Sequence, residues 1–136
     1  IRSVRGMTTD DVLCTGKYHY RFYPSAHLPH GWDAGMLFEE TNKTLFCSDL
    51  FHHFGNGSAL IESDLIELTR QAMQQMQQSP LAGYMPYTKQ AETILHSLAT
   101  LQPQTLAIMH GSSYMGNCSQ QLIDLVEVIK DSFEPI

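Results

Sequence analysis

Residues 44–51, TLFCSDLF, place the carboxylate of Asp49 directly after a short apolar run. The run over 44–48 is compact and apolar enough to be a strand inside a sheet. A carboxylate at the rim of such a strand must be paired, hydrogen-bonded or bound to a metal, because burying it alone is costly. Asp49 is therefore a candidate site residue, with a turn or helix cap as the structural alternative.

The residues before this run predict further strands. Side chains alternate over 17–23, with Tyr18, Tyr20 and Phe22 pointing to one side, as in a half-buried strand. Residues 34–40 and 44–48 predict a hairpin, because only the short polar segment 41–43 separates them. Residues 1–16 are weakly patterned and end at a predicted turn over 15–16.

Residues after the loop at 49–59 predict two helices, a strand and a last helix. Apolar residues recur at spacings of three and four over 63–78 and from about 88 to Pro103. Residues 105–109 predict a short buried strand. Asn117 is a predicted N-cap with Gln120 in the capping-box position, and four residues of the last helix are expected to face inward: Leu122, Leu125, Ile129 and Phe133. This order predicts an α/β layer fold with a crossover connection.

Two histidines join Asp49 at predicted strand ends. His30 follows the first strand closely, and His110 follows the strand at 105–109 and precedes Gly111. Each one alone is more often a loop or core histidine than a ligand. Together, three strand ends carrying histidine or aspartate predict a site at one edge of the sheet. A His/Asp/His set suits iron, zinc or manganese better than a soft metal.

The other histidines are weaker candidates. His27 lies close enough to His30 to be an alternative ligand. His52 and His53 are adjacent and point in opposite directions if extended, so at most one can face the site. His19 and His96 are expected to be structural or exposed.

Composition excludes several classes of function. The formal net charge is −6, from 14 acidic and 8 basic residues, which argues against a nucleic-acid partner and against an anionic membrane surface. No apolar run approaches the ~20 residues of a membrane-spanning helix. The odd set of cysteines, Cys14, Cys47 and Cys118, lacks a CxxC motif, which indicates reduced thiols in a cytoplasmic protein.

Three segments, in this order, carry a resemblance to a known family: HLPHGWDAG at 27–35, LFCSDLF at 45–51 and AIMHG at 107–111. Together with the two helices between Asp49 and His110, they resemble the second half of metallo-β-lactamase-fold proteins, most closely the flavodiiron and oxygen-binding diiron branch. The resemblance covers roughly residues 12–133. It implies that residues 1–136 form the C-terminal half of an αββα sandwich, a mixed sheet with flanking helices.

The resemblance also implies roles for residues. His30, Asp49 and His110 would be metal ligands, with Asp49 bridging two metals, and His30 is preferred to His27 because Gly31, Trp32 and the residues after them match the segment that follows the family's ligand. The implied cofactor is a pair of iron ions that bind or reduce dioxygen or nitric oxide, served by a redox partner. The aromatic residues Trp32, Phe51 and Phe54 would exclude water from the site.

Two alternatives remain open at this point. The first is a hydrolase of the same fold, with two zinc ions activating a water molecule against an ester, thioester or lactam. The second is an inactive dimerising module.

The family's first ligand cluster, a His-x-Glu/His-x-Asp-His run, does not occur in this sequence. With Ile1 as the first residue, we expect that the first half of the sandwich is absent and that the chain holds only half of the ligands. An apolar face left open would favour a homo-oligomer or a covering partner chain.

Overall fold

The computed structural model describes residues 3–9, 11–55 and 57–133, so Ile1 lies outside the described residues. Within them, one mixed sheet has the strand order β1-β2-β3-β4-β6-β7-β5. The sheet is antiparallel except where β4 pairs with β6 and β5 pairs with β7. Its strands are β1 (Val12–Thr15), β2 (Tyr18–Pro24), β3 (Gly35–Glu39), β4 (Thr44–Phe46), β5 (Leu60–Ile61), β6 (Thr105–Ala107) and β7 (Ser113–Met115).

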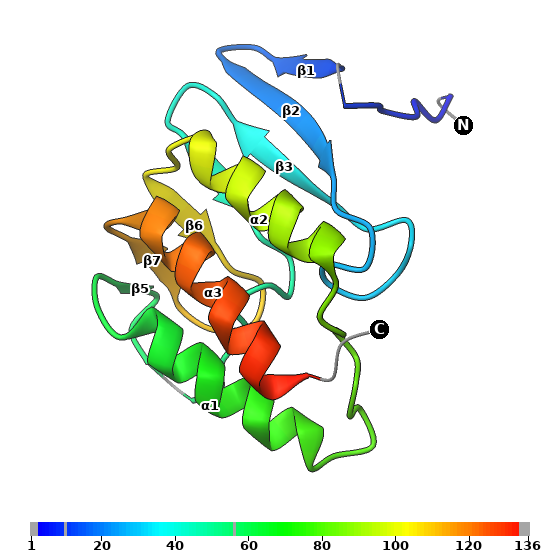
Figure 1. The fold of residues 1–136 in the computed structure, drawn as a ribbon. Helices are drawn as coiled ribbons and strands as arrows, with labels where there is room; N and C mark the ends of the chain where they lie inside the picture. Colours follow the sequence, from blue (N-terminus) through cyan, green and yellow to red (C-terminus); the bar gives the residue numbers. More distant parts are fainter. Residues whose placement is uncertain (1–2, 10, 56, 134–136) are drawn as a thin grey trace.

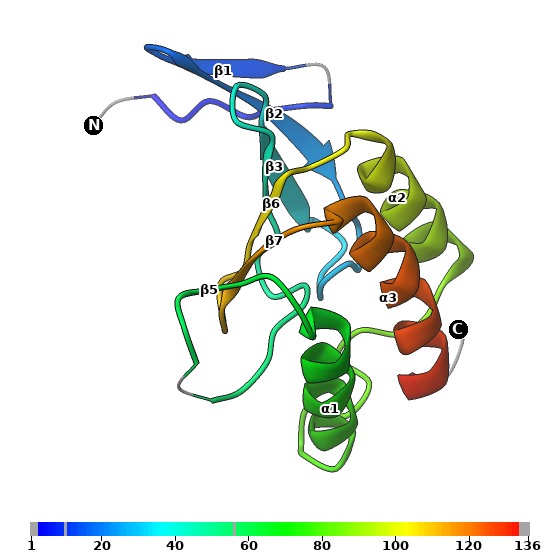
Figure 2. The ribbon, with the colours of Figure 1, turned by 90° about the vertical axis from the view of Figure 1, so that its left-hand side faces the viewer.

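Three helices, α1 (Leu65–Gln77), α2 (Lys89–Thr100) and α3 (Cys118–Ser132), lie on the same face of the sheet (Figures 1 and 2). Their apolar sides and one face of the central strands form the core. The predicted inward face of the last helix is confirmed, since Leu122, Leu125, Ile129 and Phe133 are all buried. The predicted α/β fold with a mixed sheet and flanking helices is therefore confirmed.

Side-chain caps start two of the helices. The hydroxyl of Thr88 accepts a hydrogen bond from the Ala91 N–H at the start of α2, and Asn117 accepts one from the Gln120 N–H at the start of α3. The predicted N-cap at Asn117 is correct. The reciprocal half of the capping box is absent, because the Gln120 side chain instead donates to Asp124 one turn further on.

The opposite face of the sheet carries no helix in the described part of the chain (Figure 2). Apolar side chains from its central and edge strands are exposed there, and Phe46 on β4 contacts Tyr20 on β2 with ring centroids 6.2 Å apart. The other large exposed residues that follow or belong to these strands are Leu60, Met109 and Met115. One face of the sheet is therefore covered by helices and the other is open in the described part of the chain.

The strands β1, β5 and β7 were not predicted. Each spans four residues or fewer and lies at or near an edge of the sheet, where few side chains need to be apolar. The alternation of apolar and polar side chains is therefore too short to detect in the sequence. The predicted strands at 44–48 and 105–109 are shorter than expected. Their backbones nevertheless stay paired beyond the regular strands, because Cys47 donates to Ala107 and Met109 donates to Ser48.

This parallel pairing of β4 and β6 positions the site. The carboxyl ends of parallel neighbours meet at the same edge of a sheet. Asp49 and His110 follow these two ends, so two candidate residues 61 positions apart are brought together by backbone hydrogen bonds.

Candidate metal centre

Asp49 lies in a tight turn after β4. Leu50 donates its N–H to the carbonyl of Cys47 across this turn, and Ser48 and Phe51 adopt positive φ values of 51° and 64°. The turn places Leu50 and Phe51, both fully buried, in the core. Their burial anchors the turn and directs the Asp49 carboxylate toward the rim of the sheet.

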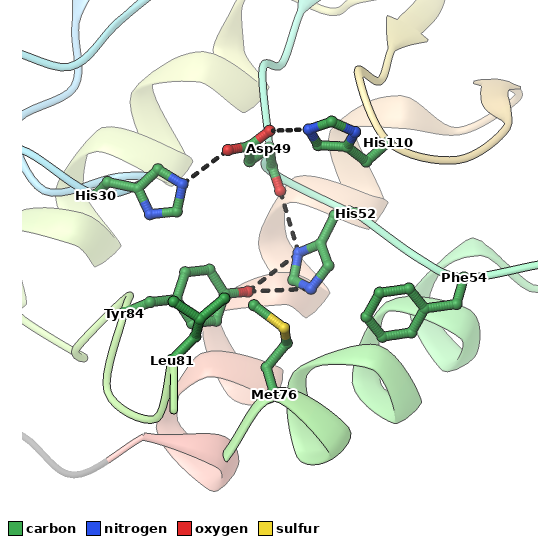
Figure 3. Close-up of a pocket in the computed structure, with 8 residues that line it drawn as sticks. All are labelled: His30, Asp49, His52, Phe54, Met76, Leu81, Tyr84 and His110. Carbon is green, nitrogen blue, oxygen red and sulfur yellow. Dashed lines mark hydrogen bonds and ion pairs between the residues drawn. The ribbon is translucent and has the colours of Figure 1, made fainter. Parts of the chain in front are cut away.

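The carboxylate of Asp49 lies between two imidazoles (Figure 3). His30 Nε2 is 2.7 Å from Oδ2, and His110 Nε2 is 3.2 Å from Oδ1. Oδ1 is buried and has no partner with hydrogen-bond geometry, although the His110 nitrogen is close to it. The three residues predicted from the sequence are therefore adjacent, and each carboxylate oxygen faces a different histidine.

This arrangement suits one half of a dinuclear centre. A carboxylate whose two oxygens face separate nitrogen ligands can bridge two cations, and a buried oxygen without a hydrogen-bond partner is a favourable metal ligand. Among residues 3–9, 11–55 and 57–133, no group of three or more His, Cys, Asp and Glu side chains is placed to hold an ion by itself. His30, Asp49 and His110 are the donors that could hold metal here, and any ion they held would need further ligands.

His52 is the adjacent histidine that faces this site. It is 5% exposed, its Nδ1 lies 3.2 Å from the Asp49 carbonyl oxygen, and the Tyr84 hydroxyl lies 3.0 Å from the same nitrogen. Burial lowers the pKa of His52, and the carbonyl and charge of Asp49 only partly offset this effect. Burial and the charge of Asp49 raise the pKa of Tyr84, so its hydroxyl stays protonated.

His53 points away and supports the turn at Gly111. Its Nε2 accepts a hydrogen bond from the Ser112 N–H at 2.9 Å, and its Nδ1 lies 3.1 Å from the Phe51 carbonyl oxygen. Because Nε2 accepts, Nδ1 can donate to the Phe51 carbonyl, and the ring has a structural role. The expectation that at most one of the two adjacent histidines faces the site is confirmed.

A pocket of about 320 Å³ opens beside the carboxylate. Its polar wall contains Asp49 and three histidines, and its apolar wall comes from the loop before α1, from α1 and from the segment between α1 and α2. The lining residues are His30, Asp49, His52, Phe54, Met76, Leu81, Tyr84 and His110. Tyr84 packs against both His30 and His52 with ring centroids 5.4 Å apart in each case.

Two predicted aromatic roles are wrong. Trp32 is 78% exposed and Phe51 is fully buried in the core, and neither lines the pocket. Phe54 does line it. His27 is exposed and outside the pocket, with its Nδ1 3.3 Å from the His30 carbonyl oxygen. Tyr84, Met76 and Leu81 were missed, because no motif distinguishes them from ordinary helix and loop residues.

Sequence comparisons identify no relative: no family model matches the chain, and no curated protein matches it. Solved structures do match. The flavodiiron protein of Giardia intestinalis has a TM-score of 0.68 at 19% identity, and the comparison covers 89% of this chain and 29% of that one. For rubredoxin oxygen:oxidoreductase of Desulfovibrio gigas, the TM-score is 0.67 at 21% identity, with 86% and 30% covered. The chemotaxis sensor ODP of T. denticola matches with a TM-score of 0.69 at 16% identity, with 91% and 49% covered.

The mixed sheet and its helices match part of the metallo-β-lactamase fold, as predicted. The chain spans half or less of the length of these structures. At such low identities the likeness establishes the fold, and the roles of individual residues rest on the geometry described above. No helix among the described residues has the length and apolar character needed to cross a membrane.

Proposed function

We propose that this chain contributes His30, Asp49 and His110 to a dinuclear iron site in a protein that binds or reduces dioxygen or nitric oxide. The observation that carries the proposal is the Asp49 carboxylate, whose two oxygens face two different imidazole nitrogens at 2.7 and 3.2 Å. A bridging carboxylate in this position is suited to a pair of divalent ions. The fold supports iron, since the matched structures include flavodiiron proteins and a diiron form of the sensor ODP.

When bound, the two ions would supply electrons and neighbouring positions for a diatomic ligand. The residues of this chain would shape the space around that ligand. Phe54, Met76 and Leu81 form an apolar wall that limits access of water. The protonated Tyr84 hydroxyl, held beside the neutral His52 ring, is a hydrogen-bond donor at the edge of the same pocket.

Metal analysis tests this proposal most directly. The longest natural polypeptide that contains these residues should be purified and measured by inductively coupled plasma mass spectrometry. About two irons per chain are expected, together with an optical change of the reduced protein on addition of oxygen or nitric oxide. Two zinc ions without any optical response would contradict the iron assignment and favour hydrolysis.

We also propose that another polypeptide, in the first instance a second copy of this chain, covers the helix-free face of the sheet. The support is the row of exposed apolar side chains on β4, β7 and the residues beside them, with a shallow pocket of about 210 Å³ lined by Phe46, Ser48, Ala107, Ile108 and Met109. Contiguous apolar surface of this kind is unusual on a monomer.

Sedimentation equilibrium checks this second proposal. The chain should sediment as a dimer or larger species, and Phe46→Lys should shift it toward monomer. The matched control is Ile123→Lys, which places the same charge on an exposed apolar residue of α3, on the helix-covered face of the sheet. A monomeric unmodified chain would contradict self-association.

A further inference from the structure

A thiol and an imidazole face each other at the outer edge of the sheet, remote from the candidate metal centre. Cys14 on β1 and His19 on β2 are Cα partners in the antiparallel register, and Cys14 Sγ lies 3.1 Å from His19 Nδ1. Both side chains are exposed. The strand pairing, continued by the Glu40 N–H donating to the His19 carbonyl, holds the two residues in this relation.

The pair has the two parts of an activated nucleophile. A thiol reacts as the thiolate, and an imidazole within hydrogen-bond distance can accept its proton. Arg21, two residues along β2 from His19, is 2.7 Å from Glu40 and bonded to it. The imidazole of His19 contacts the sulfur of Cys14.

The other two cysteines are buried, unlike the exposed Cys14. Cys47 and Cys118 are buried, at 0% and 1% exposed, and burial raises the pKa of each thiol. Neither is expected to react in the folded protein. The chain therefore contains one accessible thiol with an adjacent base and two internal reference thiols.

We propose that Cys14 is a modification site for small disulfides, with His19 as its base. The Cys14 proton passes to His19 Nδ1, and the thiolate attacks one sulfur of the incoming disulfide. A new bond forms between Cys14 Sγ and that sulfur as the original S–S bond breaks, and the departing thiolate takes up the proton from His19. The disulfide is the oxidant, and the protein gains a mixed disulfide at the edge of the sheet.

The test uses 5,5′-dithiobis(2-nitrobenzoate), a coloured small disulfide, on the folded chain. One thiol per chain should react in a fast phase, faster than N-acetylcysteine under the same conditions, and peptide mass spectrometry should place it at Cys14. His19→Gln should slow this phase by about tenfold. This factor is smaller than the rate enhancement that a fully positioned general base provides. The reason is that free thiols already react in part as thiolates without a base.

The matched control is His96→Gln, which removes an exposed histidine from α2 and should leave the rate unchanged. Circular dichroism and the continued protection of Cys47 and Cys118 would show that each variant is folded, and His19→Asn serves as a second replacement should His19→Gln not fold. The proposal is overturned if Cys14 reacts no faster than N-acetylcysteine, or if folded His19 variants react at the unmodified rate.

Discussion

Gly111 packs directly against the imidazole ring of His53. A Cβ atom at this glycine would lie 2.5 Å from Cε1 and 2.6 Å from Nδ1 of that ring, and the backbone φ of Gly111 is +133°. The ring is also held from both sides, by the Ser112 N–H and the Phe51 carbonyl. The residue directly after His110 therefore has no room for a side chain.

Gly111→Ala should lower the free energy of unfolding by about 1–3 kcal/mol, because both the φ value and the contact with His53 oppose a side chain. Gly16→Ala is the matched control. Gly16 also has a positive φ, +71°, but a Cβ there meets no atom within 4 Å, so it should cost only the roughly 1 kcal/mol of backbone strain. Urea unfolding of both variants measures the difference, and equal losses would argue against the His53 contact.

Asp49→Asn should abolish loading of the metal pair while leaving the fold intact. The amide keeps the shape of the side chain but presents one NH₂ group, which cannot ligate, to one of the two histidines. Asp124→Asn is the control, since Asp124 lies on α3, outside the pocket, and accepts a bond from Gln120. Metal content per chain is the measurement, and normal loading of Asp49→Asn would remove Asp49 from the site.

Tyr84→Phe should weaken binding of oxygen or nitric oxide without changing metal content. The ring would keep its edge contact with Phe133, at 5.4 Å between centroids, and only the hydroxyl would be lost. A neutral hydrogen bond contributes about 0.5–1.5 kcal/mol, which corresponds to a roughly 2- to 13-fold weaker affinity.

Tyr87→Phe is the control for this substitution. The Tyr87 hydroxyl donates to Glu92 at 2.6 Å, outside the pocket, so its loss should not affect ligand affinity. Optical titration of the reduced protein compares the two variants. Equal affinities of Tyr84→Phe and the unmodified protein would place the hydroxyl away from the ligand.

Glu39 makes stability depend on acid pH. It is 3% exposed, and its carboxylate accepts hydrogen bonds from the N–H groups of Thr41 and Asn42 at 2.7 and 2.8 Å. Burial raises the pKa of Glu39, but these hydrogen bonds outweigh burial and hold it below the ordinary value of 4.5. Because the folded-state pKa is the lower one, the stabilisation is fully present above pH 4.5 and is lost as the pH falls through the folded-state value.

Glu39→Gln should therefore flatten the acid dependence of the unfolding free energy and reduce stability at neutral pH. Urea unfolding between pH 3 and pH 7, roughly the range over which carboxyl groups titrate, is the measurement. Glu62→Gln, at an exposed position, is the control. An unchanged acid slope in Glu39→Gln would show that another group causes the dependence.

Much of the fold could be predicted from local pattern. The helices α1, α2 and α3 appear at their predicted places, because apolar residues at spacings of three and four require a helix to share one buried face. The strands β2, β3 and β4 follow from alternation and from the short polar segment between the last two. The strands β5 and β7 could not be predicted, because two or three residues carry no detectable period.

The site was predictable only in part, because local sequence pattern shows where strands end and does not show which strands pair. The sequence alone determined that histidine and aspartate follow apolar strands at His30, Asp49 and His110, since a polar residue after an apolar run marks the rim of a sheet. Only the tertiary structure decided how they meet. The parallel pairing of β4 with β6 joins Asp49 to His110, and the chain between α1 and α2 brings Tyr84 against His52. Such contacts depend on packing between segments distant in sequence, which local pattern does not record.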